Sequence, residues 1–177
     1  MYFSHISMLS VRRFCLNKLT ILAFSLFITS HINAQIDIKS KVDAQTYANY
    51  SKAIDLFQAN INSNSIITLF VPSNEGLERF NPQTLDAVFV NKSSNAILNF
   101  INNHSINEFK ITDDFNNLIS NSSNIVIQNK ANSNLIFSKN PPYVMITDMA
   151  GYESNILSSI TINSNISLHF ISSAIKY

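Results

Sequence analysis

The chain has 177 residues, of which 46% are hydrophobic and only 13% charged, so it is long enough for one well-buried core and too short for two. Its 12 basic and 11 acidic residues give a net charge of +1, and the first 35 residues hold three of the basic residues and none of the acidic ones, which leaves −2 on the remainder. Because the remaining basic residues are scattered along the sequence, this balance argues against a nucleic-acid partner.

Residues 1–34 have the layout of a secretory signal peptide. Three basic residues precede an apolar stretch at 19–29, and a short polar segment leads to Ala34. About 11 apolar residues are too few for a bilayer span, which needs about 20, so we expect cleavage after Ala34 and no membrane anchor. The chain's one cysteine, Cys15, would leave with the leader. We therefore expect an exported, disulfide-free domain at 35–177, either secreted or held in the periplasm or cell envelope.

The first half of this domain is predicted to be mainly helical. Apolar residues from 47 to 61 recur at spacings of three and four, with Asp43 as the cap of a helix. The run at 65–71 is apolar and β-branched, which predicts a buried strand that ends at Pro72.

Three short helices are expected to follow this strand. The first opens at Ser73 or Asn74, and the second has Asn81 as its cap with a proline at the first helical position. A third helix opens at residue 91 or 93, and its apolar residues 97, 98 and 101 face inward.

The second half of the domain is predicted to form strands, because the pattern changes to alternation or to short apolar runs. The expected strands are 104–111, 125–128, 135–137, 143–147, 156–162 and 166–171. Turn-like segments rich in Asn, Ser and Pro separate them, and Asp148 and Glu153 flank a predicted hairpin tip. Helices followed by strands indicate an α+β domain, with the helices packed on an antiparallel β-sandwich.

No arrangement of residues typical of catalysis or metal binding stands out. Only His104 and His169 lie beyond the leader, without the spacing of a zinc site, and each is expected to bind a backbone group. The acidic and amide residues at 113–117 lack the alternation and the glycine of a calcium loop and are interpreted as a solvated turn. Two glycines and no nucleophile elbow exclude the common nucleotide and serine-hydrolase motifs. We expect no enzyme activity, cofactor or metal.

Two segments resemble the signatures of fasciclin (FAS1) domains. The run Thr-Leu-Phe-Val-Pro-Ser-Asn-Glu-Gly-Leu at 68–77 resembles the first signature, and Asn-Ile-Ser-Leu-His-Phe-Ile at 165–171 resembles the second. The resemblance covers about 41–175. It implies a wedge of helices on a β-sandwich that serves in contact with cells, matrix or polysaccharide. The signature residues that we interpret as structural are Thr68, Phe70, Pro72, Ser73, Asn74, Leu77, His169 and Ile171.

The resemblance also suggests a binding region. The Tyr-His dipeptide of the family falls on Asn103 and His104, with Asn in place of Tyr, and this region is associated with integrin contact in animal members. Asn103 and His104 are therefore the candidate binding residues.

Two functions follow as hypotheses. The first is a non-enzymatic adhesion module that contacts a surface or matrix protein or a polysaccharide. The alternative is a carrier of a small apolar ligand, held between the helices and the sheet, which requires a pocket of several hundred cubic ångströms.

Overall fold

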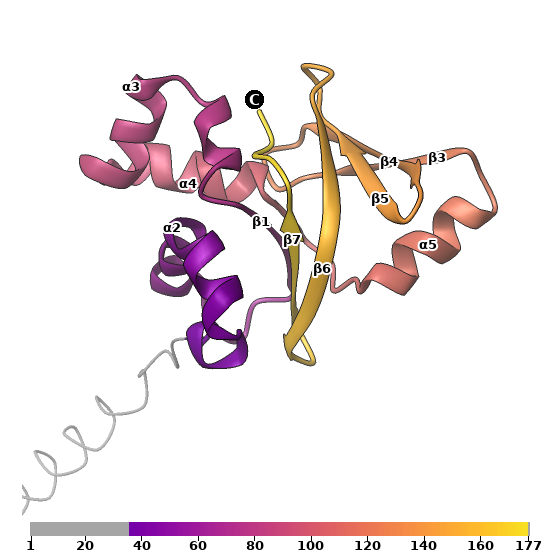
Figure 1. The fold of residues 1–177 in the computed structure, drawn as a ribbon, viewed down its shortest axis with the longest axis horizontal. Helices are drawn as coiled ribbons and strands as arrows, with labels where there is room; N and C mark the ends of the chain where they lie inside the picture. The colour runs from indigo at the N-terminus through magenta and orange to yellow at the C-terminus, as the bar shows by residue number, and fades with distance from the viewer. Residues whose placement is uncertain (1–35, 177) are drawn as a thin grey trace, which may run out of the picture. The chain divides into compact units, whose positions relative to one another are not determined.

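The computed structural model describes residues 36–176 (Figure 1), so the predicted signal peptide lies outside the described residues. The helices are α2 (Ala44–Asn60), α3 (Pro82–Leu85), α4 (Ser94–Asn103) and α5 (Thr112–Ser120). Short 3₁₀ turns at Lys39–Lys41 (η2) and Gly76–Arg79 (η3) and one π-helical turn at Asp86–Val90 (η4) complete the helical part.

The predicted helix caps are confirmed. Asp43 accepts a hydrogen bond from the Thr46 N–H at 2.9 Å at the start of α2, and Asn81 accepts one from the Thr84 N–H at 2.8 Å at the start of α3. Each carboxylate or amide oxygen satisfies a backbone donor that the first helical turn leaves without an intrahelical partner.

Seven strands form one continuous sheet in the order β2-β1-β7-β6-β5-β4-β3. The strands are β1 (Ile67–Pro72), β2 (Ser105–Ile106), β3 (Asn124–Gln128), β4 (Asn134–Asn140), β5 (Tyr143–Thr147), β6 (Glu153–Asn163) and β7 (Ile166–Ile171). The sheet curls, so that the N–H of Lys130, just beyond β3, donates to the carbonyl oxygen of Ser105 in β2 at 2.8 Å. The two ends of the sheet thus approach each other as in a barrel.

The α+β class is confirmed, but the sheet differs from the expected antiparallel sandwich in two respects. It is a single curled sheet, and it is mixed, because the central strands β1 and β7 run parallel. The last strand inserts between β1 and β6 and so lies beside the first one (Figure 1). A pairing between residues about a hundred positions apart leaves no trace in a local apolar pattern.

The predicted strand at 104–111 and the solvated turn at 113–117 are wrong. Only Ser105–Ile106 pair as a strand, and the acidic residues lie in the first turn of α5. There the Asp114 carboxylate accepts a hydrogen bond from the Ile111 N–H at 2.8 Å, and the helix N-terminus favours negative charge. Phe115 and Ile119, one turn apart, are the buried residues of the helix; two apolar residues were too weak a pattern to indicate it.

The chain length predicted one core, but the buried apolar residues form two, which lie on opposite faces of the β1–β7 pair. Ile67, Leu69 and Val71 of β1 pack in the core that the helices α2 and α4 cover. Phe70, between them, points into the second core, inside the curl of the sheet, which α5 closes. Side chains alternate across a strand, so these two central strands form the common wall of both cores.

Candidate functional site

His104, one of the two candidate binding residues, is fully buried at the end of α4. Its Nδ1–H donates to the carbonyl oxygen of Phe100 at 2.9 Å, and its Nε2 accepts from the N–H of Ile175 at 2.9 Å. The ring also stacks on Phe100, with centroids 4.2 Å apart. Burial lowers the pKa of His104 to about 4, so the neutral ring joins α4 to the C-terminal segment.

Asn103, the other candidate, is 4% exposed and fixes a neighbouring turn. Its backbone and side-chain oxygens both accept from the Asn129 side chain at 3.2 Å. The side-chain oxygen of Asn129 in turn accepts from the N–H groups of Ala131 and Ser133 at 2.9 Å. Asn103 thereby holds the β3–β4 turn, including Lys130, against the end of α4.

The exposed surface next to these residues is a groove of about 440 Å³, which we call the α4 groove. It runs between the end of α2, α4 and the β3–β4 turn, and its lining includes Asn60, Asn62, Leu98, Asn102 and Lys130. Leu98, which the apolar pattern placed on the inward face of α4, is 56% exposed, so the prediction is wrong for that residue. Within residues 36–176, the side chains of Asn102 and Lys130 make no hydrogen bond or ion pair. The groove thus offers polar groups that the fold itself does not use.

A second, larger groove of about 660 Å³ lies between α2 and the π-helical turn η4. Its lining is mainly apolar and includes Leu56, Val88, Phe89 and Ile97. Single π-helical turns are frequent at functional sites. Residues of neither groove were predicted from the sequence, since each groove combines segments that carry no motif of their own.

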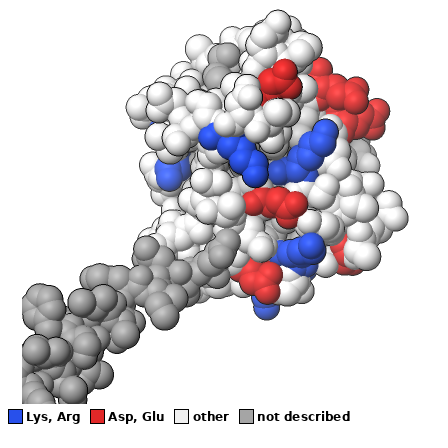
Figure 2. Space-filling view, turned by 90° about the vertical axis from the view of Figure 1, so that its left-hand side faces the viewer, with Lys and Arg blue, Asp and Glu red and all other residues white. Residues whose placement is uncertain are grey.

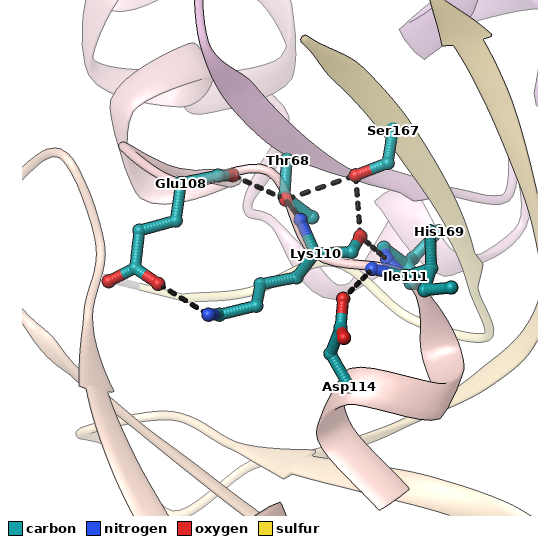
Figure 3. Close-up of polar contacts among 7 residues, drawn as sticks. All are labelled: Thr68, Glu108, Lys110, Ile111, Asp114, Ser167 and His169. Atoms are coloured by element: carbon teal, nitrogen blue, oxygen red, sulfur yellow. Dashed lines mark hydrogen bonds and ion pairs between the residues drawn. The ribbon is translucent and has the colours of Figure 1, made fainter. Parts of the chain in front are cut away.

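His169, Thr68 and Ser167 form a polar cluster on the β1–β7 wall (Figure 3). The Thr68 hydroxyl donates to the carbonyl oxygen of Glu108 at 2.6 Å and accepts from the Lys110 N–H at 2.9 Å. The Ser167 hydroxyl lies 2.6 Å from the carbonyl oxygen of Lys110, to which the Nε2–H of His169 also donates at 2.9 Å. These bonds fasten the segment between β2 and α5 across both strands.

His169 is fully buried, which keeps its ring neutral at ordinary pH. Burial lowers the pKa of His169 to about 4, against the smaller opposing effects of its hydrogen bond to Lys110 and of the Asp114 charge. An ion pair between Lys110 and Glu108, 2.9 Å long, lies on the solvent side of the same segment.

Ser73 and Asn74 have separate tasks within the first signature. The Ser73 hydroxyl oxygen accepts from the Gly76 N–H at 2.8 Å at the start of η3. The Asn74 side chain enters the hydrogen-bond ladder of α2, donating to the Ala48 carbonyl at 2.9 Å and accepting from the Lys52 N–H at 3.2 Å. The amide supplies both the donor and the acceptor that these two bonds need.

The other signature residues complete the frame around the strand ends. Pro72 is the last residue of β1, Leu77 is buried against the helical core, and Ile171 ends β7 in the second core. Like Phe70 they are buried, and none of them lines either groove.

Gly76 is the small residue of the first signature, and its substitution tests whether close packing requires a glycine at this position. A Cβ at Gly76 would lie 2.6 Å from the carbonyl oxygen of Ser172 and 2.8 Å from Cα of Ser173. Because both are backbone atoms, we expect Gly76→Ala to lower the free energy of unfolding by about 2–3 kcal/mol in urea titrations. Gly151→Ala is the control, since its Cβ meets open space and only the φ of +79° opposes it, a cost of about 1 kcal/mol. Equal losses would contradict the packing role of Gly76.

Asp148 confirms the predicted hairpin tip between β5 and β6 and has a further contact. Its Oδ1 accepts from the N–H groups of Ala150 and Tyr152 at 2.9 Å, while its Oδ2 accepts from the Lys176 N–H at 2.8 Å. The carboxylate therefore organises the turn and holds the C-terminal segment.

Charge is dispersed over the helical side of the molecule. Figure 2, which views that side, shows Lys and Arg interspersed with Asp and Glu and no large patch of one sign. Among residues 36–176, no three His, Cys, Asp or Glu side chains gather into a set that could hold a metal ion. No helix in that range has the length and apolarity of a bilayer span.

Comparison with known proteins agrees with the resemblance of the two signatures. A model of the Fasciclin domain family matches residues 42–176. The chain is also similar to the FAS1 domain pair of the insect cell adhesion molecule Fasciclin I, with 17% identity and a TM-score of 0.48. That match covers 71% of this chain and 45% of the other, so this chain spans less than half of the domain pair. No curated protein matches. Since the family model covers most of its length, the chain belongs to the fasciclin domain family.

Proposed function

We propose that this chain is an exported adhesion module that contacts a surface or matrix protein or a glycan outside the cytoplasm. Fasciclin domains are generally involved in cell adhesion or protein binding and are typically extracellular or secreted. The signal-peptide pattern at 1–34, with cleavage after Ala34, supports export.

The α4 groove is the observation that carries this proposal. The side-chain amide of Asn102 can donate and accept hydrogen bonds in fixed directions, which suits the hydroxyl groups of a glycan or the backbone of a peptide. Leu98 of α4 adds an exposed apolar contact, and Lys130 adds one positive charge. The buried residues Asn103 and His104 support this surface, and the exposed residues of the α4 groove contact the partner.

Multivalent binding is the direct test. Residues 35–177, displayed in many copies on beads, are incubated with matrix proteins, polysaccharides and cells of the source organism, because clustering raises a weak affinity to a measurable avidity. We expect a reproducible partner whose binding falls at least about tenfold in Leu98→Asp, since a charge at the centre of a contact is costly.

Leu118→Asp is the matched control, because Leu118 is a similarly exposed leucine on α5, at the opposite end of the molecule in Figure 1. It should bind as the parent chain does. If both variants lost binding equally, or if neither lost binding, the α4 groove would not be the binding site.

The second groove favours a carrier of a small apolar ligand as the alternative function. Its volume of about 660 Å³ is within the range of ligand pockets, although it lies between helices and not between the helices and the sheet. Absence of binding to any surface, together with a lipid found by mass spectrometry in the purified protein, would favour this function over adhesion.

A further inference from the structure

Strand β3 forms one edge of the sheet, and the two-residue strand β2 forms the other. The one ladder partner of β3 is β4, with Val126 opposite Ile136. The N–H of Asn129 donates to the carbonyl oxygen of Ser133. In an antiparallel ladder every second residue bonds to the neighbouring strand, so Ile127 and Ile125 also direct their backbone groups to β4. Asn124, Val126 and Gln128 therefore direct theirs away from the sheet. The free edge ends at Lys130, whose N–H already bonds to Ser105.

Three usual protections against pairing with another chain are missing from this edge. Natural edge strands carry charges, prolines or bulges that prevent such pairing. The β3 sequence Asn-Ile-Val-Ile-Gln has neither a charge nor a proline, its pairing with β4 is regular, and Val126 is 57% exposed. The strand is rich in residues that favour sheets.

The same sequence is complementary to itself. It reads almost identically in both directions, so a two-fold axis at Val126 would place Val126 opposite itself and Ile125 opposite Ile127. Asn124 would meet Gln128 of the second copy. The outward backbone groups would then form about six hydrogen bonds, two for each facing pair.

Charge and side-chain packing favour the same arrangement. The nearest charged residue along the chain, Lys130, would lie opposite Ser122 of the second copy, so no like charges would meet. On the outer face of the sheet, the exposed Ile136 and Val126 of each copy would form a continuous row of four β-branched side chains across four strands.

We propose that the partner of β3 is a second copy of this chain, joined by antiparallel β3–β3 pairing about a two-fold axis at Val126. The dimer goes beyond the proposed function and does not depend on it. One consequence is that each dimer carries two α4 grooves, so that a weak contact with a surface gains avidity without any new residue.

Sedimentation velocity over a range of protein concentrations tests the dimer. The purified chain is expected to associate reversibly at micromolar concentration. Val126→Lys and Val126→Asp each place two like charges opposite one another across the axis, and each should raise the dissociation constant at least about tenfold. Val126 is exposed, so far-UV circular dichroism should show both variants folded.

The mixture of the two variants is the decisive measurement. An equimolar mixture of Val126→Lys and Val126→Asp should dimerise again, because only a pairing that brings position 126 against itself places the opposite charges together. Leu157→Lys, an exposed residue of the interior strand β6, should dimerise as the parent chain does. A parent chain that stays monomeric, a Val126→Lys variant that still dimerises, or a mixture that stays monomeric would each overturn the proposal.

Discussion

The free energy of unfolding is expected to fall steeply as the pH drops from about 6.5 to about 4. His104 and His169 are buried as neutral rings whose pKa values burial lowers from 6.5 to about 4. Between these pH values the unfolded chain binds a proton at each histidine and the folded chain does not, so acid favours unfolding. At about 1.4 kcal/mol per pKa unit, each histidine contributes about 3 kcal/mol. Both together approach the whole stability of a typical domain, about 5–15 kcal/mol.

Other shifted groups act outside this window. The hydrogen bonds from Thr46 lower the pKa of Asp43 below its ordinary 3.8, so the contribution of Asp43 is lost only at more acidic pH. Burial raises the pKa of Tyr50 above 10, which leaves its phenol neutral throughout the range. The slope between pH 6.5 and 4 therefore reports chiefly on the two histidines.

Urea unfolding followed by far-UV circular dichroism at several pH values measures this slope. His169→Gln is the informative variant, because its amide N–H can still donate to the Lys110 carbonyl oxygen while the side chain no longer titrates. We expect the slope to be roughly halved, whatever the stability of the variant at pH 7. A wild-type stability that is constant across this window would mean that the histidines are not buried as neutral rings.

The parts of the fold that were predictable from the sequence depend on neighbouring residues. Asp43 and Asn81 cap helices through bonds to residues three positions on, and such signals are visible in a short window. The parallel β1–β7 pairing joins the two ends of the domain, and no short window contains both. The expectation of an antiparallel sheet was wrong for that reason.

The candidate site shows the same division. Resemblance to the family indicated Asn103 and His104 as candidate binding residues. The α4 groove lies beside these two residues. The sequence could not show that both side chains are buried, since Asn103 finds its partner Asn129 and His104 finds Ile175 only in the folded chain. Leu98 and Lys130 come from different segments and line the same groove only in the folded chain.

Phe70→Ala is expected to lower the free energy of unfolding by about 3–5 kcal/mol, the usual cost of removing a fully buried phenylalanine. The Phe70 ring is inaccessible to solvent and packs within 6.3 Å, between ring centroids, of Phe115, Phe137 and His169. It lies on β1, whose neighbouring residues Leu69 and Val71 belong to the helical core. A cavity at Phe70 therefore weakens the wall that both cores share.

Because both cores share the β1–β7 wall, we also expect the Phe70→Ala variant to unfold cooperatively. If the two cores depend on β1 and β7 together, the Phe70→Ala variant should unfold in one cooperative step, with far-UV and near-UV circular dichroism changing together. Tyr143→Ala, which removes an exposed aromatic residue from β5, is the control and should cost less than about 1 kcal/mol. Two separate transitions in the Phe70 variant would show that the helical core persists after the curl of the sheet has opened, and that the β1–β7 pair is held by the helices alone.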